Sequence, residues 1–396
     1  MSKQFIWNAV GTTLNSFLSL FLLIIVTRCN GIEASGDFSF LFTISLMLQS
    51  FSNYGGRIYQ TTDVKEEFTF NEYLSSRILL SLISVVIYAI LCIIYGFKYN
   101  IILIGILLVL FRIIETVSDV IYGSLQKKHK LDIVGKSLTI KSIFILILFS
   151  ITNFISKNLL YSTISLLIAG IIIFLIYDFK NIINYKFKLN YEIYKKSFSI
   201  FISGFVTLLI LNIPRFISEI TLKDNELGYL GILLMIPTIM SLVCQFLLQP
   251  QIINLSEKYK NLDLKEFKKC YRRINAAILL FSIFCTICAI ALGNPILTLL
   301  YGIPFDKYIL GFCILILSGT FNGISIVYSN LFVIIRKSKL QLAPFTITLL
   351  VSPIVVLYLS QKLGLYGVFY SLLITMFIQT MIFIIINNKI LKKAFK

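Results

Sequence analysis

The chain has 396 residues, is 58% hydrophobic and has a mean hydropathy of +0.89, far outside the range of soluble proteins. Its formal net charge of +18 would fit a nucleic-acid-binding protein, but the basic residues lie in short segments between long apolar stretches. The composition therefore excludes a soluble enzyme and a nucleic-acid partner, and it indicates a membrane protein.

Apolar stretches of about 20 residues, each long enough to cross a bilayer as a helix, recur along the whole chain. We expect twelve transmembrane helices, at 5–27, 38–58, 77–97, 101–124, 138–156, 159–178, 198–219, 229–250, 274–300, 308–332, 342–361 and 366–388. The first stretch lacks a small-x-small cleavage site, so it reads as a retained helix rather than a signal peptide. The predicted fold class is an all-α membrane protein.

Lys and Arg alternate in number from one connecting segment to the next. The segments on the side of the N-terminus hold 26 of the 36, with Arg77 counted in the second of them. The opposite segments hold one each, namely Arg28, Lys98, Lys157, Lys223, Lys307 and Lys362. Because cytoplasmic loops carry the excess of Lys and Arg, we expect a multi-pass protein of the bacterial inner membrane with both termini in the cytoplasm.

The most basic connection, 251–273, carries seven Lys and Arg beside apolar residues at near-helical spacing. Those apolar residues are Leu255, Tyr259, Leu262, Phe267 and Tyr271. This pattern predicts an amphipathic helix that lies on the inner leaflet, where it would contact anionic membrane lipids.

The twelve stretches divide into two sets of six at the basic segment before residue 198. Thr27-Arg28 followed by Gly36 in the first half resembles Pro214-Arg215 followed by Gly228 in the second. An even number of spans in each half gives both halves the same orientation, which is a parallel repeat. We therefore predict two six-helix lobes, 1–197 and 198–396, around a central cavity that opens alternately to the two sides.

Charged residues inside the predicted spans point to that cavity, because each would cost about 2.5–3.5 kcal/mol if it faced lipid. At 100° per residue, Arg112, Glu115 and Asp119 fall within about 60° of one helix face. Arg215 and Glu219 lie one turn apart in another span, beside Asn212. Two interpretations stay open: the charges pair to hold helices together, or they line the cavity.

On the second interpretation the basic residues attract an anion, and arginine suits bidentate contact with phosphate. The predicted substrate-binding residues are Arg28, Arg57, Arg112, Lys141, Asn212 and Arg215. The predicted ion-coupling residues, which would bind a proton or Na⁺, are Glu115, Asp119 and Glu219. No catalytic residue, metal site or cofactor is expected beyond that coupling ion. The Cys285-x-x-Cys288 pair has no second pair or nearby His, so packing is the better reading.

Four stretches of the chain resemble a known family: 7–40, 115–138, 211–239 and 247–259. The third, LNIPRFISEITLKDNELGYLGILLMIPTI, is the most specific. They resemble the Wzx-type polysaccharide flippases, for O-antigen or capsule repeat units, of the multidrug/oligosaccharidyl-lipid/polysaccharide exporter superfamily. The resemblance implies two lobes that alternate in access and carry an undecaprenyl-diphosphate-linked oligosaccharide through a cationic cavity. By position, Arg28, Arg57 and Arg215 match basic cavity residues of that family, and Glu115 and Asp119 match its acidic stretch.

The partners implied are the lipid-linked oligosaccharide, membrane lipids and other polysaccharide-assembly proteins. One alternative is a cation-coupled multidrug exporter (an antiporter) of the same superfamily, although intramembrane bases match or outnumber acids here. A second alternative, a polytopic polysaccharide polymerase, is weaker because every predicted external loop is short. The chain also lacks a phosphate-binding glycine motif. We therefore expect a transporter and not an enzyme.

Overall fold

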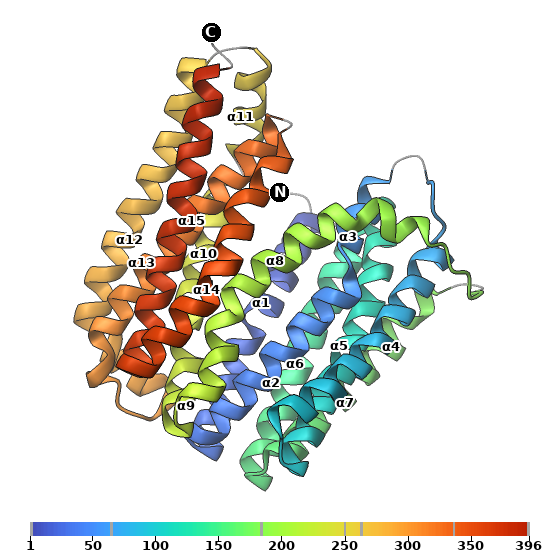
Figure 1. Ribbon diagram of the computed structural model, residues 1–396. Coiled ribbons are helices and arrows are strands. Elements are labelled where there is room, and N and C mark those ends of the chain that lie inside the picture. The colour runs from blue at the N-terminus through green and yellow to red at the C-terminus, as the bar shows by residue number, and fades with distance from the viewer. Residues whose placement is uncertain are drawn as a thin grey trace. The chain divides into compact units, whose positions relative to one another are not determined.

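The computed structural model describes residues 3–63, 66–182, 185–248, 251–261, 264–335 and 337–393. Throughout these residues the regular secondary structure is helical, and no β-strand occurs among them (Figure 1). Eleven helical segments of this part of the chain are long and apolar enough to cross a bilayer. The protein is therefore an all-α, multi-pass membrane protein.

The chain forms two compact units, here called unit 1, which ends at Leu208, and unit 2, which begins at Leu209. The division lies inside α8 (Glu192–Thr221). The assignment of residues 1–197 and 198–396 to two lobes around a cavity stays a prediction.

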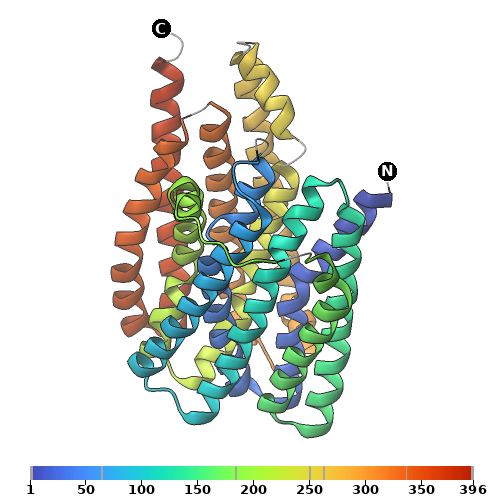
Figure 2. The same cartoon turned by 90° about the vertical axis from the view of Figure 1, so that its right-hand side faces the viewer.

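The described residues of unit 1 form seven helices, two short turns and the first part of α8. They are α1 (Lys3–Asn30), α2 (Ile32–Asn53), α3 (Gly56–Thr62), α4 (Phe70–Tyr95), α5 (Tyr99–Lys127), α6 (Leu131–Ser156), α7 (Leu159–Ile173), a π-helical turn (Phe174–Asp178) and a 3₁₀ turn (Phe179–Asn181). Helix α6 packs between α1 and α7, and α5 contacts α2, α4 and α7 (Figure 2). The core of unit 1 thus centres on α5 and α6.

The second predicted span, 38–58, differs from the observed helix. Helix α2 covers Ile32–Asn53 and ends because Tyr54 and Gly55 take left-handed backbone angles, with φ of 44° and 68°. Helix α2 is 22 residues long but contains Glu33, Asp37 and Gln49, and it is not among the eleven apolar segments. Arg57, expected at the end of this span, lies instead on the separate helix α3.

Helix α4 starts earlier than the predicted span at 77–97. The Thr69 side chain accepts a hydrogen bond from the Glu72 backbone N–H, while the Glu72 carboxylate accepts one from the Thr69 backbone N–H. This capping box satisfies two backbone donors at the helix start and fixes the first turn at Phe70. Arg77, counted above as a loop residue, is therefore inside a helix and is 1% exposed.

In unit 2, the part of the chain that the structure describes forms the rest of α8 and seven further helices. They are α9 (Asp224–Leu233), α10 (Met235–Leu248), α11 (Gln251–Lys260), α12 (Leu264–Tyr301), α13 (Ile309–Ile334), α14 (Leu342–Leu363) and α15 (Leu365–Lys393), with 3₁₀ turns at Asp306–Tyr308 and Ser338–Gln341. Helices α9 and α10 lie where a single span, 229–250, was predicted, and they are separated by an interruption at Leu234. Pro237 lacks the N–H that would bond to the Leu233 carbonyl, which accounts for the interruption. Helix α13 is central, since α10, α12 and α15 all pack against it.

The segment 251–273 is not one surface helix as predicted. It divides into α11 and the first turns of α12, which continues without a break to Tyr301. From Leu264 to Ala291 that helix contains neither Gly nor Pro, so nothing ends it at the expected span boundary near 274. Leu262, one of the apolar residues of the predicted pattern, lies outside the described residues.

Candidate functional site

Among the described residues of unit 1, polar side chains gather in three neighbouring groups along α5. We call them the Lys141 network (Ser118, Tyr122, Ser137, Lys141, Asp178), the Arg112–Glu115 pair and the Arg57 groove. Helix α5 contributes to all three, through Ser118 and Tyr122, through Arg112 and Glu115, and through Asp119. Charged groups in a membrane helix are stable only where protein or water provides hydrogen-bond or charge partners. The partners of each group are therefore what stabilise it.

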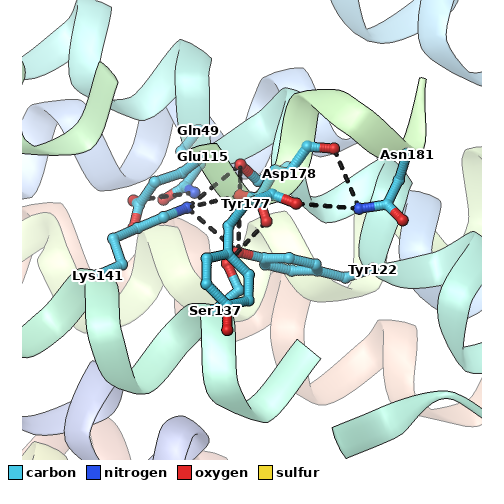
Figure 3. Close-up of polar contacts among 9 residues, drawn as sticks. Gln49, Glu115, Tyr122, Ser137, Lys141, Tyr177, Asp178 and Asn181 are labelled. Atoms are coloured by element: carbon cyan, nitrogen blue, oxygen red, sulfur yellow. Dashed lines mark hydrogen bonds and ion pairs between the residues drawn. The ribbon is translucent and has the colours of Figure 1, made fainter. Parts of the chain in front are cut away.

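The Lys141 network is sealed inside unit 1 (Figure 3). The Lys141 ammonium donates to Asp178 Oδ2 at 3.3 Å, to Ser118 Oγ at 3.2 Å and to the Tyr122 hydroxyl at 3.2 Å. Asp178 also accepts from Ser118 at 2.8 Å, Tyr122 at 3.1 Å and Ser137 at 2.7 Å. The side chains of Lys141 and Asp178 are each only 2% exposed. The network therefore links α5, α6 and the turn after α7 by fully desolvated polar contacts.

Asp178 was not singled out from the sequence. It is the last residue of the π-helical turn Phe174–Asp178, a wide turn of the kind that often occurs at functional positions. The Asn181 side chain donates to the carbonyls of Tyr177 and Asp178 and completes the end of this helix (Figure 3). The sequence signal that could have identified Asp178 was an isolated carboxylate at the end of one apolar stretch, together with an isolated lysine, Lys141, inside another.

Arg112 and Glu115 form an ion pair one turn apart on α5. The Arg112 guanidinium also lies over the Phe42 ring, 4.4 Å from its centroid, and the Glu115 carboxylate accepts from Gln49 Nε2 at 3.4 Å. Arg112 is 7% and Glu115 9% exposed. Because Phe42 and Gln49 both lie on α2, the Arg112–Glu115 pair joins α5 to α2. The pair also neutralises two buried charges.

The Arg57 groove is an open cavity of about 390 Å³ on unit 1. Arg57 Nη1 pairs with Asp119 Oδ1 at 3.5 Å, and Arg57 Nε donates to Gln126 Oε1 at 3.2 Å. The side chains of Arg57 and Asp119 are 30% and 22% exposed, in contrast to the buried Arg112 and Lys141. The wall combines polar and apolar side chains: Gln49, Asn53, Arg57 and Asp119, with Leu46, Ile200, Phe201, Phe205 and Leu208.

Behind the groove lies Arg77, which the sequence analysis missed. Its guanidinium packs against Gly56, where there is no room for a Cβ, and donates to the Ser52 carbonyl at 3.4 Å. This buried guanidinium thus adds positive charge near the base of the groove, behind the accessible Arg57. Recognition of the Thr69–Glu72 capping box in the sequence would have placed Arg77 inside the membrane helix.

The remaining predicted residues lie elsewhere. Arg28 is exposed in the last turn of α1, where a cation is favourable at the negative end of the helix dipole. In unit 2, Arg215 on α8 is 2% exposed, and its Nη1 donates to the Leu227 carbonyl of α9 at 2.7 Å. Asn212 and Glu219 are half-buried on the same helix. The substrate and ion-coupling roles of all these residues stay predictions. Among the described residues, no group of His, Cys, Asp and Glu is arranged to hold a metal ion.

Comparison with protein families shows which family the chain belongs to. Residues 1–250 match the family model described as "Polysaccharide biosynthesis protein", which covers more than half of the chain. The chain belongs to this family. It is 27% identical over 358 residues to the "Capsular polysaccharide biosynthesis protein CapF" of Staphylococcus aureus, an alignment that covers 86% of this chain and 89% of that protein.

Solved structures share the fold. An inward-facing multidrug resistance MATE family transporter of the MOP superfamily covers 100% of both chains at 13% identity, with a TM-score of 0.76. The lipid II flippase MurJ, in an inward closed conformation, covers 97% of this chain and 87% of its own at 20% identity, with a TM-score of 0.67. The protein thus belongs to a polysaccharide biosynthesis family and shares the fold of these two membrane transport proteins.

Proposed function

We propose that the protein is a flippase that moves an undecaprenyl-diphosphate-linked oligosaccharide repeat unit across the bacterial inner membrane. In this proposal twelve membrane helices form two six-helix lobes, 1–197 and 198–396, around a central cavity. The lobes open alternately to the two sides, with both termini in the cytoplasm. The polyprenyl tail stays in the bilayer while the diphosphate and the glycan pass through the cavity.

Family membership and named relatives support the class of substrate. The family and the Staphylococcus aureus relative are both described by polysaccharide biosynthesis, and MurJ is described as a lipid II flippase. A polar glycan on a lipid carrier cannot cross the hydrocarbon core unaided, because its hydroxyls would lose their hydrogen bonds to water. A transporter in such a family would supply a polar path.

The observation that carries the proposal is the accessible guanidinium of Arg57 in the groove of unit 1. A planar guanidinium can hold two phosphate oxygens at once, which makes it suited to a diphosphate. The amides of Gln49 and Asn53 on the same wall offer donors and acceptors to sugar hydroxyls. Without substrate, Asp119 balances the Arg57 charge at 3.5 Å. A diphosphate would replace that carboxylate, and Arg28, Asn212 and Arg215 are the further proposed contacts.

The test replaces Arg57 and measures surface polysaccharide against the amount of protein in the membrane. Arg57→Ala removes a charge-assisted contact of about 1.5–3 kcal/mol, so export should fall at least about ten-fold at unchanged protein level. Arg57→Lys should retain part of the export because it keeps the charge but loses the bidentate geometry. Lys136→Ala, which removes a cation of a half-exposed ion pair on α6, is the matched control. Normal export by Arg57→Ala would contradict the assignment.

We further propose that Glu115, Asp119 and Glu219 provide the ion-coupling carboxylates. Protonation of Glu115 would release the Arg112 guanidinium, so this pair can link ion binding to the packing of α2 on α5. Glu115→Gln should keep the protein in the membrane but make export insensitive to collapse of the proton or sodium gradient. Export by Glu115→Gln that still follows the gradient as wild type does would remove this role.

A multidrug exporter is the second candidate, because the MATE structure matches the fold over the full length of both chains. Cationic drugs need an acidic cavity, whereas the Arg57 groove pairs one carboxylate with one guanidinium and lies near buried Arg77. Ethidium efflux measured beside polysaccharide export separates the two candidates. Efflux that depends on Asp119 but not on Arg57 would favour the exporter.

A further inference from the structure

One face of helix α12 is exposed. This helix is the least buried of the eleven spans, with 11% of its most apolar window inside the protein. Along this face Leu280, Ile283, Phe284 and Ile287 are 58–68% exposed and recur every three or four residues. Such a stripe of large apolar side chains on a membrane protein packs against acyl chains.

The same face becomes basic toward the start of the helix. One turn before Ala276 the apolar residues give way to five cations at helical spacing: Lys265, Lys268, Lys269, Arg272 and Arg273. The opposite face of these turns is closed by Phe267, Cys270 and Tyr271, which are 1%, 8% and 4% exposed. The cations therefore cannot turn inward, and they extend over about 12 Å of helix just beyond the apolar stripe.

The five cations and Ala276 line a shallow recess of about 490 Å³. Among the described residues, the Glu266 carboxylate lies beside them and pairs with Lys258 at 3.4 Å and Lys269 at 3.1 Å. The five cations that line the recess thus outnumber this carboxylate. Figure 1 labels α12 at the left of the picture, with α11, which carries Lys258, near its upper end.

We propose that this basic face, residues Lys265–Arg273, is a binding site for the phosphate headgroup of an anionic phospholipid. The acyl chains of the bound lipid lie along the Leu280–Ile287 stripe, and the headgroup lies among the five cations. A free phosphate could use only the basic half of this surface, whereas a lipid uses both halves. The predicted topology puts the site in the cytoplasmic leaflet, where anionic lipids attract such clusters. The site is separate from the Arg57 groove and does not depend on the proposed flippase activity.

The test titrates lipid onto the purified full-length protein and follows thermal stability and bound lipid by native mass spectrometry. Phosphatidylglycerol should bind and stabilise, and phosphatidylcholine should not. Each surface cation contributes about five-fold in affinity. The variant with all five cations changed to Gln should therefore lose about a thousand-fold or more in apparent affinity, and the milder Arg272→Gln/Arg273→Gln should lose about 25-fold.

The matched control changes five exposed lysines of unit 1, Lys128, Lys130, Lys180, Lys186 and Lys195, to Gln and should bind as wild type does. Equal binding of phosphatidylcholine, unchanged affinity in both α12 variants, or an equal loss in the control would overturn the proposal. Inorganic diphosphate that replaces the lipid fully would also overturn it, because the site would then recognise a free phosphate.

Discussion

At the residue scale, two of the most fully desolvated charges of unit 1 pair with each other. Lys141 and Asp178 are far apart in sequence yet satisfy one another and three hydroxyls without solvent. Removal of one member of such a pair leaves the other charge buried and unpaired, which is costly, whereas removal of both is often tolerated. The difference between single and double substitution therefore distinguishes a buried ion pair from a residue whose only role is to contact substrate.

We therefore expect Lys141→Met and Asp178→Leu each to lower the free energy of unfolding by about 3–5 kcal/mol, and the double variant to recover most of that loss. Thermal unfolding of the purified protein measures this, with Lys136→Ala as a half-exposed control. Additive losses in the double variant would show that the two charges do not stabilise each other.

Asp63, which follows α3 outside the membrane spans, predicts a pH dependence. Burial alone would raise its pKa, but hydrogen bonds from the backbone N–H groups of Glu67 and Phe68 and from the Tyr73 hydroxyl lower the pKa below its ordinary value of 3.8. A lowered pKa means that ionised Asp63 stabilises the fold fully above that ordinary value. The contribution is lost as the pH falls through the folded-state pKa.

Wild type should therefore be more stable than Asp63→Asn at neutral pH, and this gap should narrow below about pH 4. Melting temperatures of both proteins across an acid series measure it. A gap that stays constant down to pH 3 would mean that ionisation of Asp63 is not the cause.

Residue chemistry was partly predictable from the sequence. The shared face of Arg112, Glu115 and Asp119 was visible at 100° per residue, and the structure places all three on one side of α5, toward α2 and α3. Which charges pair was not visible. Arg112 pairs with Glu115, whereas Asp119 pairs with Arg57. The second pair forms because the helix breaks at Tyr54 and Gly55, which places Arg57 on the separate helix α3.

At the element scale, the packing of α1 on α6 depends on two glycines. A Cβ at Gly11 would overlap the Gly135 backbone, and a Cβ at Gly135 would overlap the Trp7 backbone. Such close approach of small residues is a common way for membrane helices to pack.

We expect Gly11→Ala and Gly135→Ala each to lower stability by about 1–3 kcal/mol, since the helices must separate to admit the methyl group. Gly204→Ala is the control: it lies in α8, and nothing lies within 4 Å of its added Cβ. Thermal unfolding compares the three. A loss in Gly204→Ala as large as in the other two would point to a general effect of glycine replacement.

The hydropathy of the sequence predicted where the helices lie along the chain, but it did not predict the residues at which they begin and end. Apolar stretches place all the long helices, but the start of α4 depends on the Thr69–Glu72 capping box and the interruption at Leu234 on Pro237. Helix α12 starts ten residues before its apolar stretch because basic residues are good helix formers. A hydropathy window cannot detect any of these local hydrogen-bonding and backbone effects.

At the scale of the whole molecule, composition and the alternation of basic segments were enough to predict a multi-pass membrane protein. The resemblance to polysaccharide flippases is confirmed by the family match. The Arg57 groove was beyond prediction in its details, because it needs α2, α3, α5 and the start of α8 to meet. The sequence showed the cations, and only the fold distinguishes the accessible Arg57 from the buried Arg112 and Lys141.

The most direct measurement of the central claim is flipping by the purified protein in proteoliposomes. Undecaprenyl-diphosphate-linked oligosaccharide with a labelled glycan is placed in one leaflet, and its arrival in the other is followed with a membrane-impermeant reagent. We predict translocation by the wild type and by Lys136→Ala, and a rate at least about ten-fold lower in Arg57→Ala. Translocation no faster than in protein-free vesicles, or an equal rate in Arg57→Ala, would contradict the account.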